Sequence, residues 1–318
     1  MDTLDFVKVT EAAALAASRW MGKGERDLAD QAAVERMREV LNDMDIRGKI
    51  VIGEGERDEA PMLFIGEVVG KGGVEADIAV DPVEGTNLVA NGLPNSIAVL
   101  AVTAKGGLLN APDTYMNKIA VGPKAAPYVH IDATTAENLQ CVANALERPV
   151  SDITVVILDR PRHKQLIEEV RAAGAKIKLI SDGDVDAAIA TAIDGTGIHV
   201  AMGIGGAPEG VLAAAALRCL GGGFMGRLKP RNEDEIRRAK EMGFDHVDKV
   251  LAMDDLVKTN DVTFVATGIT DGDLCRGVRF FGNGARTHSI IMNSISRTVR
   301  FVETVHRLRA EPFRVRQH

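Results

Sequence analysis

Cysteine, aromatic residues and long apolar runs are all scarce in this sequence. The 318 residues include three cysteines, Cys141, Cys219 and Cys275, which lie far apart and follow no metal-ligand or disulfide spacing. Aromatic residues make up 4% of the chain, so the core must be built from Ala, Val, Ile, Leu and Met. No apolar stretch approaches the ~20 residues that a membrane span needs, and the acidic N-terminus lacks a hydrophobic signal region. We therefore expect a cytoplasmic protein with no membrane partner.

An excess of positive charge is also missing. The chain has 38 lysines and arginines against 45 aspartates and glutamates, which gives a formal net charge of −7. General nucleic-acid binders carry a basic patch or stripe, so this charge balance argues against nucleic acid as a partner. It leaves phosphorylated small molecules open as ligands, because a few local cations can hold a phosphate on an acidic protein.

The spacing of apolar residues predicts two halves of different organisation. The first half has helical patterns and then short strands, at 6–20, 30–42, 49–52, 76–80, 97–102 and 118–121. From about residue 151, strands alternate with helices, at 153–158, 163–173, 176–180, 185–193, 198–202 and 210–220. This alternation is typical of a parallel sheet in an α/β layer. We predict an α+β domain over 1–150 and an α/β domain over 151–318, with strands at 262–302 packing back on the first.

Acidic side chains follow two of the predicted strands, at the point where each strand ends. Glu54 comes two residues after the strand 49–52, and Asp81 and Glu84 follow the strand 76–80. Glycines beside Glu54 and Glu84 let a ligand approach the backbone closely. Several carboxylates cannot cluster in the ionised state without a cation between them. Because the donors are oxygens with no histidine or cysteine nearby, the pattern favours a hard dication, Mg²⁺ or Mn²⁺.

The segment Asp81–Thr86, with the sequence Asp-Pro-Val-Glu-Gly-Thr, resembles the Asp-Pro-(Ile/Leu)-Asp-Gly-Thr signature of the lithium-sensitive sugar and inositol phosphatases. Its glutamate and the preceding segment 51–63 are similar to class II fructose-1,6-bisphosphatases of the GlpX type. Further blocks match in the order of that family, at 109–116, 161–163, 182–185, 203–210 and 266–270. The resemblance implies a layered α/β/α/β/α sandwich. It also implies hydrolysis of the 1-phosphate of fructose 1,6-bisphosphate, a step of gluconeogenesis that yields fructose 6-phosphate and phosphate.

The resemblance also implies which residues form the site. The metal ligands, for Mn²⁺ or Mg²⁺, would be Asp30, Glu54, Asp81, Glu84 and Glu209. The substrate contacts would be Glu84, Gly85, Thr86, Tyr115, Arg160, Pro161, Arg162, Asp182, Gly183, Asp184 and Gly206. These residue types suit a sugar phosphate, because a guanidinium can hold a phosphate bidentately and an aspartate can accept hydrogen bonds from sugar hydroxyls. Taken alone, Asp30 has the pattern of a helix N-cap and Glu209 that of a first-turn carboxylate, so only the resemblance assigns them to a metal.

For the chemical step we expect metal-assisted hydrolysis with two further residues in catalytic roles. Asp58, with Glu59 nearby, is the candidate for orienting or deprotonating the attacking water. Thr86 would position the nucleophile or support the leaving oxygen. Members of the superfamily commonly assemble as dimers or tetramers, so the resemblance also implies a homo-oligomer.

Two other functions remain open from the sequence. One is a sugar or inositol monophosphatase of the same superfamily, which needs only one phosphate subsite. The other is a nucleotide-binding module without activity, suggested by the glycines at 203–206, although Pro208 stands where the dinucleotide fingerprint wants a third small residue. Within the family, residues 228–233 are short where some members carry an insertion. Residues 19–24 are similar to bifunctional members that also accept sedoheptulose 1,7-bisphosphate.

Overall fold

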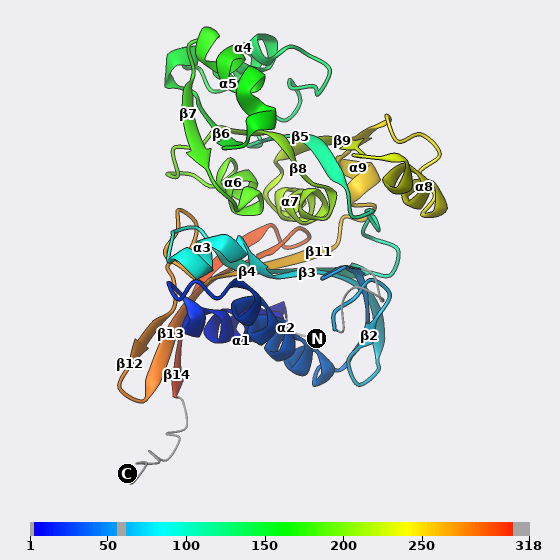
Figure 1. The fold of residues 1–318 in the computed structure, drawn as a ribbon, viewed down its shortest axis with the longest axis vertical. Coiled ribbons are helices and arrows are strands. Elements are labelled where there is room, and N and C mark those ends of the chain that lie inside the picture. The colour runs from blue at the N-terminus through cyan, green and yellow to red at the C-terminus, as the bar shows by residue number, and fades with distance from the viewer. Residues whose placement is uncertain (1–2, 56–61, 308–318) are drawn as a thin grey trace.

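The computed structural model describes residues 3–55 and 62–307, which form five stacked layers (Figure 1). One sheet lies between helices α1 and α2 on its outer side and α6 and α7 on its inner side. A second sheet lies between α6 and α7 and the outer helices α4 and α5. These helices span Val7–Ala17 (α1), Arg26–Asn42 (α2), Thr135–Ala145 (α4), Lys164–Ala172 (α5), Asp184–Ala190 (α6) and Ala207–Leu220 (α7). The predicted α/β/α/β/α sandwich is confirmed.

The first sheet combines strands from both ends of the chain. Its order is β12-β13-β11-β4-β3-β1-β2, with β14 paired to β13. The strands are β1 (Ile46–Ile52), β2 (Val68–Val69), β3 (Val74–Glu84), β4 (Ile97–Ala104), β11 (Val262–Gly268), β12 (Arg279–Phe281), β13 (Gly284–Asn293) and β14 (Thr298–Arg307). β11 pairs antiparallel with β4 from Val262 to Gly268, so the C-terminal strands do extend the N-terminal sheet, as predicted.

The second sheet has the order β10-β9-β5-β8-β6-β7. Its strands are β5 (Tyr115–Val121), β6 (Thr154–Leu158), β7 (Lys176–Ile180), β8 (Val200–Gly206), β9 (Gly223–Lys229) and β10 (Val250–Ala252). β6 is parallel to β7 and β8, but β5 is antiparallel to β8 and β9, and β10 is antiparallel to β9. The parallel arrangement predicted for the strands at 153–158, 176–180 and 198–202 is confirmed for β6, β7 and β8. The sheet as a whole is mixed, because a strand from before residue 150 inserts between β8 and β9.

The two sheets exchange segments along the chain. β5 and α4 precede residue 150 yet belong to the layers of the second sheet, whereas β11 to β14 follow residue 150 and belong to the first. A domain boundary near residue 150 remains a proposal, since it concerns which parts fold and move together. The remaining helices are α3 (Thr86–Asn91), α8 (Glu233–Glu241) and α9 (Met253–Leu256). No helix among the described residues is long and apolar enough to cross a membrane.

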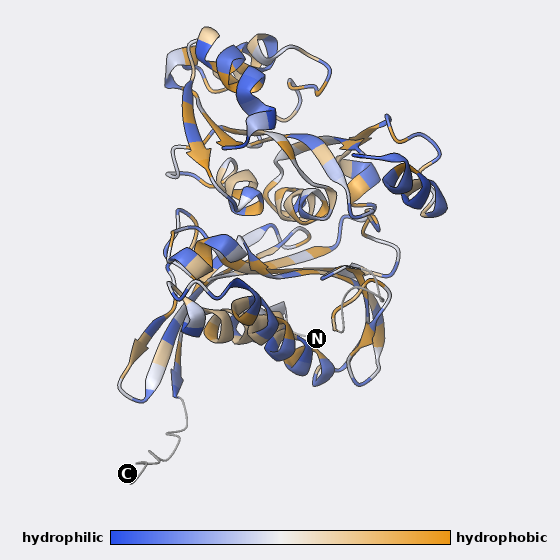
Figure 2. Ribbon diagram, viewed as in Figure 1, coloured by the Kyte–Doolittle hydropathy of each residue, from blue (hydrophilic) through white to orange (hydrophobic). Residues whose placement is uncertain are grey.

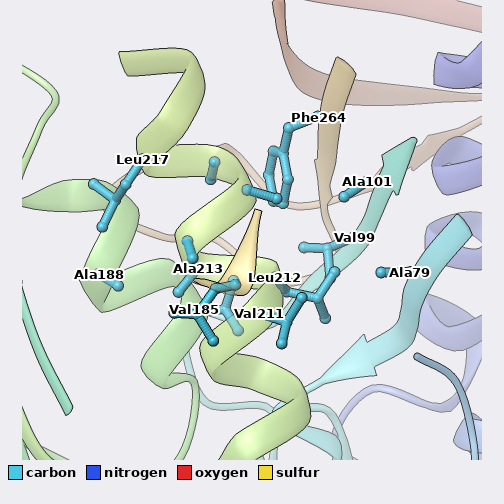
Figure 3. Close-up of a cluster of buried hydrophobic side chains, with 14 of the residues drawn as sticks. Ala79, Val99, Ala101, Val185, Ala188, Val211, Leu212, Ala213, Leu217 and Phe264 are labelled. Atoms are coloured by element: carbon cyan, nitrogen blue, oxygen red, sulfur yellow. The ribbon is translucent and has the colours of Figure 1, made fainter. Parts of the chain in front are cut away.

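Helix α7 is buried on all sides because it lies between the two sheets. Its side chains from Val211 to Leu217 are almost fully buried and include the alanine run 213–216. Figure 3 shows Val211 and Leu212 facing Val99 of β4, with Phe264 of β11 beside them. A helix that is apolar all round is expected where both faces are covered. Hydrophilic residues dominate the peripheral helix α8 instead (Figure 2).

Candidate active site

A pocket of about 650 Å³ lies where elements of the two sheets meet. It is lined from the first sheet by the ends of β1 and β3, from the second by β5, β6 and β8, and by the first turns of α2, α3, α6 and α7. Among the described lining residues are all five predicted metal ligands and, apart from Pro161, all the predicted substrate contacts. Pro161 lies between two lining residues, at the start of the short 3-10 turn Pro161–His163.

Two glycines shape the strand ends that carry the first acidic residues. A Cβ on Gly53 would lie 2.0 Å from the carbonyl oxygen of Leu63, so the returning chain leaves no room for a side chain there. This close approach lets Glu54 N donate to that same oxygen (3.1 Å) and fixes Glu54 at the end of β1. Gly85 has a φ of +82°, which other residues rarely adopt, and it turns the chain from β3 directly into α3.

The end of β3 aims two carboxylates into the pocket. Its pairing with β4 shifts register between Asp81 and Glu84, an irregularity that changes the direction of side chains along a strand. Asp81 Oδ1 accepts a hydrogen bond from Val83 N (3.0 Å), and Glu84 Oε1 accepts one from Val185 N in α6 (2.9 Å). Glu84 therefore ties the two halves of the pocket together. Thr86 Oγ1 donates to the carbonyl of Val83 (3.2 Å).

Negative charge is unfavourable on the carboxylates at one end of the pocket, called here the acidic end. These are Asp30, Glu54, Asp81, Glu84 and Glu209. Burial, together with the nearby carboxyl of Asp30, raises the pKa of Glu54 to about 8. Burial also raises the pKa of Asp81 well above its usual range, with contributions from Glu54 and Glu209. The pKa of Glu84 is raised by burial and then by Asp81. The acidic end therefore cannot be fully ionised at neutral pH without added positive charge.

The chemistry of the acidic end fits a hard dication. Its donors are all carboxylate oxygens, the ligands that Mg²⁺ and Mn²⁺ prefer. Asp30 and Glu54 lie close enough to shift each other's pKa, as do Asp81 and Glu84. Within the described ranges, no group of three or more His, Cys, Asp or Glu side chains is arranged so that it could hold a metal ion. The side chains thus form neighbouring acid pairs lining one pocket, and a cation bound between them would relieve their mutual repulsion.

Glu209 reaches this end because β8 finishes in glycine. A Cβ on Gly206 would lie 1.9 Å from Glu209 Oε2, so the carboxylate occupies the space that a side chain would take. Lys118 Nζ pairs with Asp184 Oδ2 (2.7 Å), and its charge partly offsets the rise that burial imposes on the pKa of Glu209. The glycines before α7 therefore accommodate protein carboxylates. A carboxylate at this helix start disfavours a nucleotide phosphate there, which argues against the nucleotide-binding alternative.

Arginines and Tyr115 line the opposite side of the pocket, called here the cationic end. Arg160 donates to Asp182 Oδ1 (3.0 Å), and Arg162 donates to the carbonyl of Ile204 through two nitrogens (3.0 and 2.8 Å). The Arg162 guanidinium carbon lies 4.7 Å from the centroid of the Tyr115 ring. Each guanidinium is thus fixed through some of its nitrogens. The arrangement suits binding of an anionic group.

A buried histidine holds the arginine turn against β8. His163 Nε2 accepts a hydrogen bond from Ile204 N (2.7 Å), and its Nδ1 contacts the carbonyl of Leu158 at 2.6 Å. This pairing requires the neutral ring with the proton on Nδ1, in agreement with a pKa lowered by burial. Opposite the turn, Gly183 has a φ of +87° and starts α6 between Asp182 and Asp184.

Sequence reasoning missed several residues that line the pocket. Arg26, Asn87, Asp113, Thr114 and Arg231 had no assigned role, although all five line it. Asn87 comes directly after Thr86, and Arg26 lies one helical turn before Asp30 on α2, so their closeness to assigned residues could have signalled them. Arg231 gave no such signal, since tertiary contacts alone bring it to Tyr115. The proposed catalytic residues Asp58 and Glu59 lie outside the described residues.

Comparison with known proteins gives a consistent answer over nearly the full length. The family described as bacterial fructose-1,6-bisphosphatase, glpX-encoded, matches residues 2–306. A protein of Synechococcus sp. (strain JA-3-3Ab) is 55% identical, covering 95% of this chain and 94% of the relative. One from Trichodesmium erythraeum (strain IMS101) is 52% identical, covering 95% of each. Both relatives are named D-fructose 1,6-bisphosphatase class 2/sedoheptulose 1,7-bisphosphatase.

Proposed function

The chain belongs to the family of bacterial, glpX-encoded fructose-1,6-bisphosphatases, and on that premise we propose that its pocket removes the 1-phosphate of fructose 1,6-bisphosphate to give fructose 6-phosphate. The enzyme is a phosphoric monoester hydrolase. The observation that carries the proposal is the polarity of one pocket, acidic at one end and cationic at the other. A substrate with a phosphate at each end of a sugar matches that polarity.

At the acidic end, we assign Asp30, Glu54, Asp81, Glu84 and Glu209 to the binding of Mn²⁺ or Mg²⁺. Such a cation supplies charge neutralisation for the reacting phosphate and activation of water. The protein's own contribution is to hold five carboxylates around one pocket, Glu84 buried and the other four partly buried, at an electrostatic cost that cation binding relieves. Thr86, two residues after Glu84 and at the first position of α3, lies where its hydroxyl can support the attacking or leaving oxygen. Asp58 remains the proposed base.

At the cationic end, Arg160, Arg162 and Tyr115 bind the phosphate that does not react. The guanidinium groups supply charge-assisted hydrogen bonds to its oxygens. Asp182 and Asp184 accept hydrogen bonds from sugar hydroxyls, and each is oriented by a cation, Arg160 and Lys118 respectively. Glycines at 85, 183 and 206 also line the pocket.

The substrate range extends to sedoheptulose 1,7-bisphosphate, because the relatives' names include that activity. The stretch 19–24, which is similar to bifunctional members, does not line the pocket in the described chain. Gly22 N and Gly24 N donate to the carbonyls of Val89 and Ala90 (2.9 Å each), so this stretch braces the outer side of α3. This stretch would influence the substrate range by setting the position of α3, and with it that of Thr86.

A panel of phosphate-release assays tests the proposal. The enzyme is incubated with fructose 1,6-bisphosphate, sedoheptulose 1,7-bisphosphate, fructose 1-phosphate and inositol 1-phosphate, with Mn²⁺ or Mg²⁺ and then with a chelator. We expect hydrolysis of the bisphosphates, lost on chelation and restored by the metal. Faster turnover of the monophosphates would favour the monophosphatase alternative, and no release from any substrate would exclude catalysis.

We further propose that the enzyme is a homo-oligomer, a dimer or tetramer, in the cytoplasm. The proposal rests on the family assignment. Light scattering on the purified chain measures the assembly mass directly, and a mass equal to the 34.0 kDa of one chain would exclude an oligomer. Cell fractionation tests the location.

A further inference from the structure

Arg231 lies at the cationic end, although neither motif nor resemblance assigned it a role. It lines the same pocket as Arg160 and Arg162, and it comes from the connection between β9 and α8. Its guanidinium carbon is 5.0 Å from the centroid of the Tyr115 ring, which Arg162 approaches at 4.7 Å. Two guanidinium groups therefore pack against one aromatic ring.

The position of Arg231 is fixed by a buried carboxylate. Glu235 is 2% exposed, and its Oε1 accepts a hydrogen bond from Arg231 Nε (2.6 Å) while Oε2 accepts one from the backbone N of Arg231 (2.8 Å). Thr114, the neighbour of Tyr115, also donates to Oε2 (2.5 Å). Asn232 caps α8 by accepting from Glu235 N (2.9 Å), which fixes Glu235 itself.

This anchoring leaves part of the guanidinium available. Among the described residues, Nε and the backbone N of Arg231 are hydrogen-bonded, whereas its two terminal nitrogens have no partner. Asp113 also lines the pocket near Arg231, but within the described chain the two form no ion pair. The Arg231 side chain is 51% exposed, so a bound ligand can reach its terminal nitrogens.

Two like charges beside one ring repel each other, and an anion between them removes that repulsion. We propose that Arg231 is a specificity-determining residue that binds the non-reacting phosphate of the sugar bisphosphate together with Arg162. This inference rests on the proposed function. Glu235 acts as the positioning residue, because it orients Arg231 and, through Thr114, the start of β5. The subsite therefore combines guanidinium groups from two separate connections of the second sheet.

The test compares one arginine variant on substrates with and without the second phosphate. Arg231→Ala should lower kcat/KM for fructose 1,6-bisphosphate by about 10- to 100-fold, mainly through KM, since one charge-assisted hydrogen-bonding group is lost. Turnover or binding of fructose 1-phosphate should stay unchanged. The inhibition constant of fructose 6-phosphate, which carries only the non-reacting phosphate, should rise by the same factor.

Arg237→Ala is the matched control, because it removes the same side chain from α8 at a residue that pairs with Asp234 (3.1 Å) and does not line the pocket. It should leave all three constants unchanged. Equal losses on fructose 1-phosphate and the bisphosphate would show a merely structural role and overturn the inference, as would no loss on either. Failure of the proposed function is visible separately, since the unmodified enzyme would then not hydrolyse the bisphosphate with Mn²⁺ or Mg²⁺.

Discussion

The acidic and cationic ends of the pocket differ in how their charges are supported. At the acidic end, Glu84 is 5% exposed, and the carboxylates raise one another's pKa. At the cationic end, Arg231 is 51% exposed, and each guanidinium is held by a carbonyl or carboxylate of the protein. The difference indicates that the acidic end depends on a cation to offset its charge, whereas the cationic end is held in place by the protein and keeps guanidinium nitrogens available for an anion. Removing a charge should therefore have different consequences at each end.

The largest effect is expected from the acidic end. Asp81→Asn should lower kcat/KM for fructose 1,6-bisphosphate by about 10³-fold, because a lost metal ligand removes several kcal/mol of stabilisation at the reacting phosphate. Phosphate release at saturating Mn²⁺ measures the change. Glu75→Gln, on the same strand at an exposed ion pair with Lys105, should retain activity. Activity of Asp81→Asn within tenfold of the unmodified enzyme would contradict the metal assignment.

Without metal, the same Asp81→Asn substitution should make the folded protein more stable, although it lowers activity. Mn²⁺ at 100 times its Kd should stabilise the unmodified protein by about 2.7 kcal/mol, seen as a higher unfolding temperature. Asp81→Asn should lose most of this shift, yet unfold at a higher temperature than the unmodified protein in chelator, since one buried acid is gone. Thermal unfolding with and without chelator measures both. An equal metal shift in both proteins would place the cation elsewhere.

The cationic end should show a substrate-dependent effect instead. Arg162→Ala should lower kcat/KM by about 10- to 100-fold for the bisphosphate, through loss of charge-assisted hydrogen bonds, and leave fructose 1-phosphate unaffected. It should leave the Mn²⁺ stability shift intact. Arg171→Ala, an exposed change on α5 away from the pocket, serves as the control. A loss that is the same for both substrates would mean that the two ends are not separate in function.

Asp186 is a buried acid that belongs to neither end of the pocket, so it provides a third case of a carboxyl group with a raised pKa. Its Oδ1 has no hydrogen-bond partner among the described residues, and burial, with a smaller contribution from Asp273, raises its pKa to about 7 from 3.8. Between these values the folded protein keeps a proton that the unfolded chain releases. Stability should therefore fall as pH rises from about 4 to 7, by up to about 1.4 kcal/mol per pH unit.

Asp186→Asn should reduce this pH dependence and leave the part that the raised pKa values at the acidic end contribute. Asp194→Asn, an exposed change shortly after α6, should not change it. Urea unfolding in chelator across this pH range measures the slope. Identical slopes in Asp186→Asn and the unmodified protein would show that another group carries the proton.

The sequence predicted the acidic end better than the cationic end for a physical reason. Strand-end carboxylates such as Glu54 and Asp81 follow from local pattern, because a strand and the glycine after it are encoded in neighbouring residues. Asp30 needed a family resemblance, since its own surroundings look like an ordinary helix start. Arg231 depends on Glu235, Thr114 and Tyr115, which are brought together only by the pairing of β5 with β9. The same insertion of β5 makes the second sheet mixed, although the strands predicted to be parallel, β6, β7 and β8, are parallel.

Helix α7 has a consequence for the size of molecule that the enzyme accepts. Its alanines at 213–216 lie between the two sheets and not at the pocket, and their small side chains keep this packing layer thin. The first sheet carries most of the acidic residues and the second carries the arginines, so this helix works as a spacer that sets the reach between them. A sugar with phosphates at both ends can bridge that span, and one with a single phosphate leaves one side without a partner. The thickness of the helix layer between the two sheets thus limits the length of substrate that can contact both sides of the pocket.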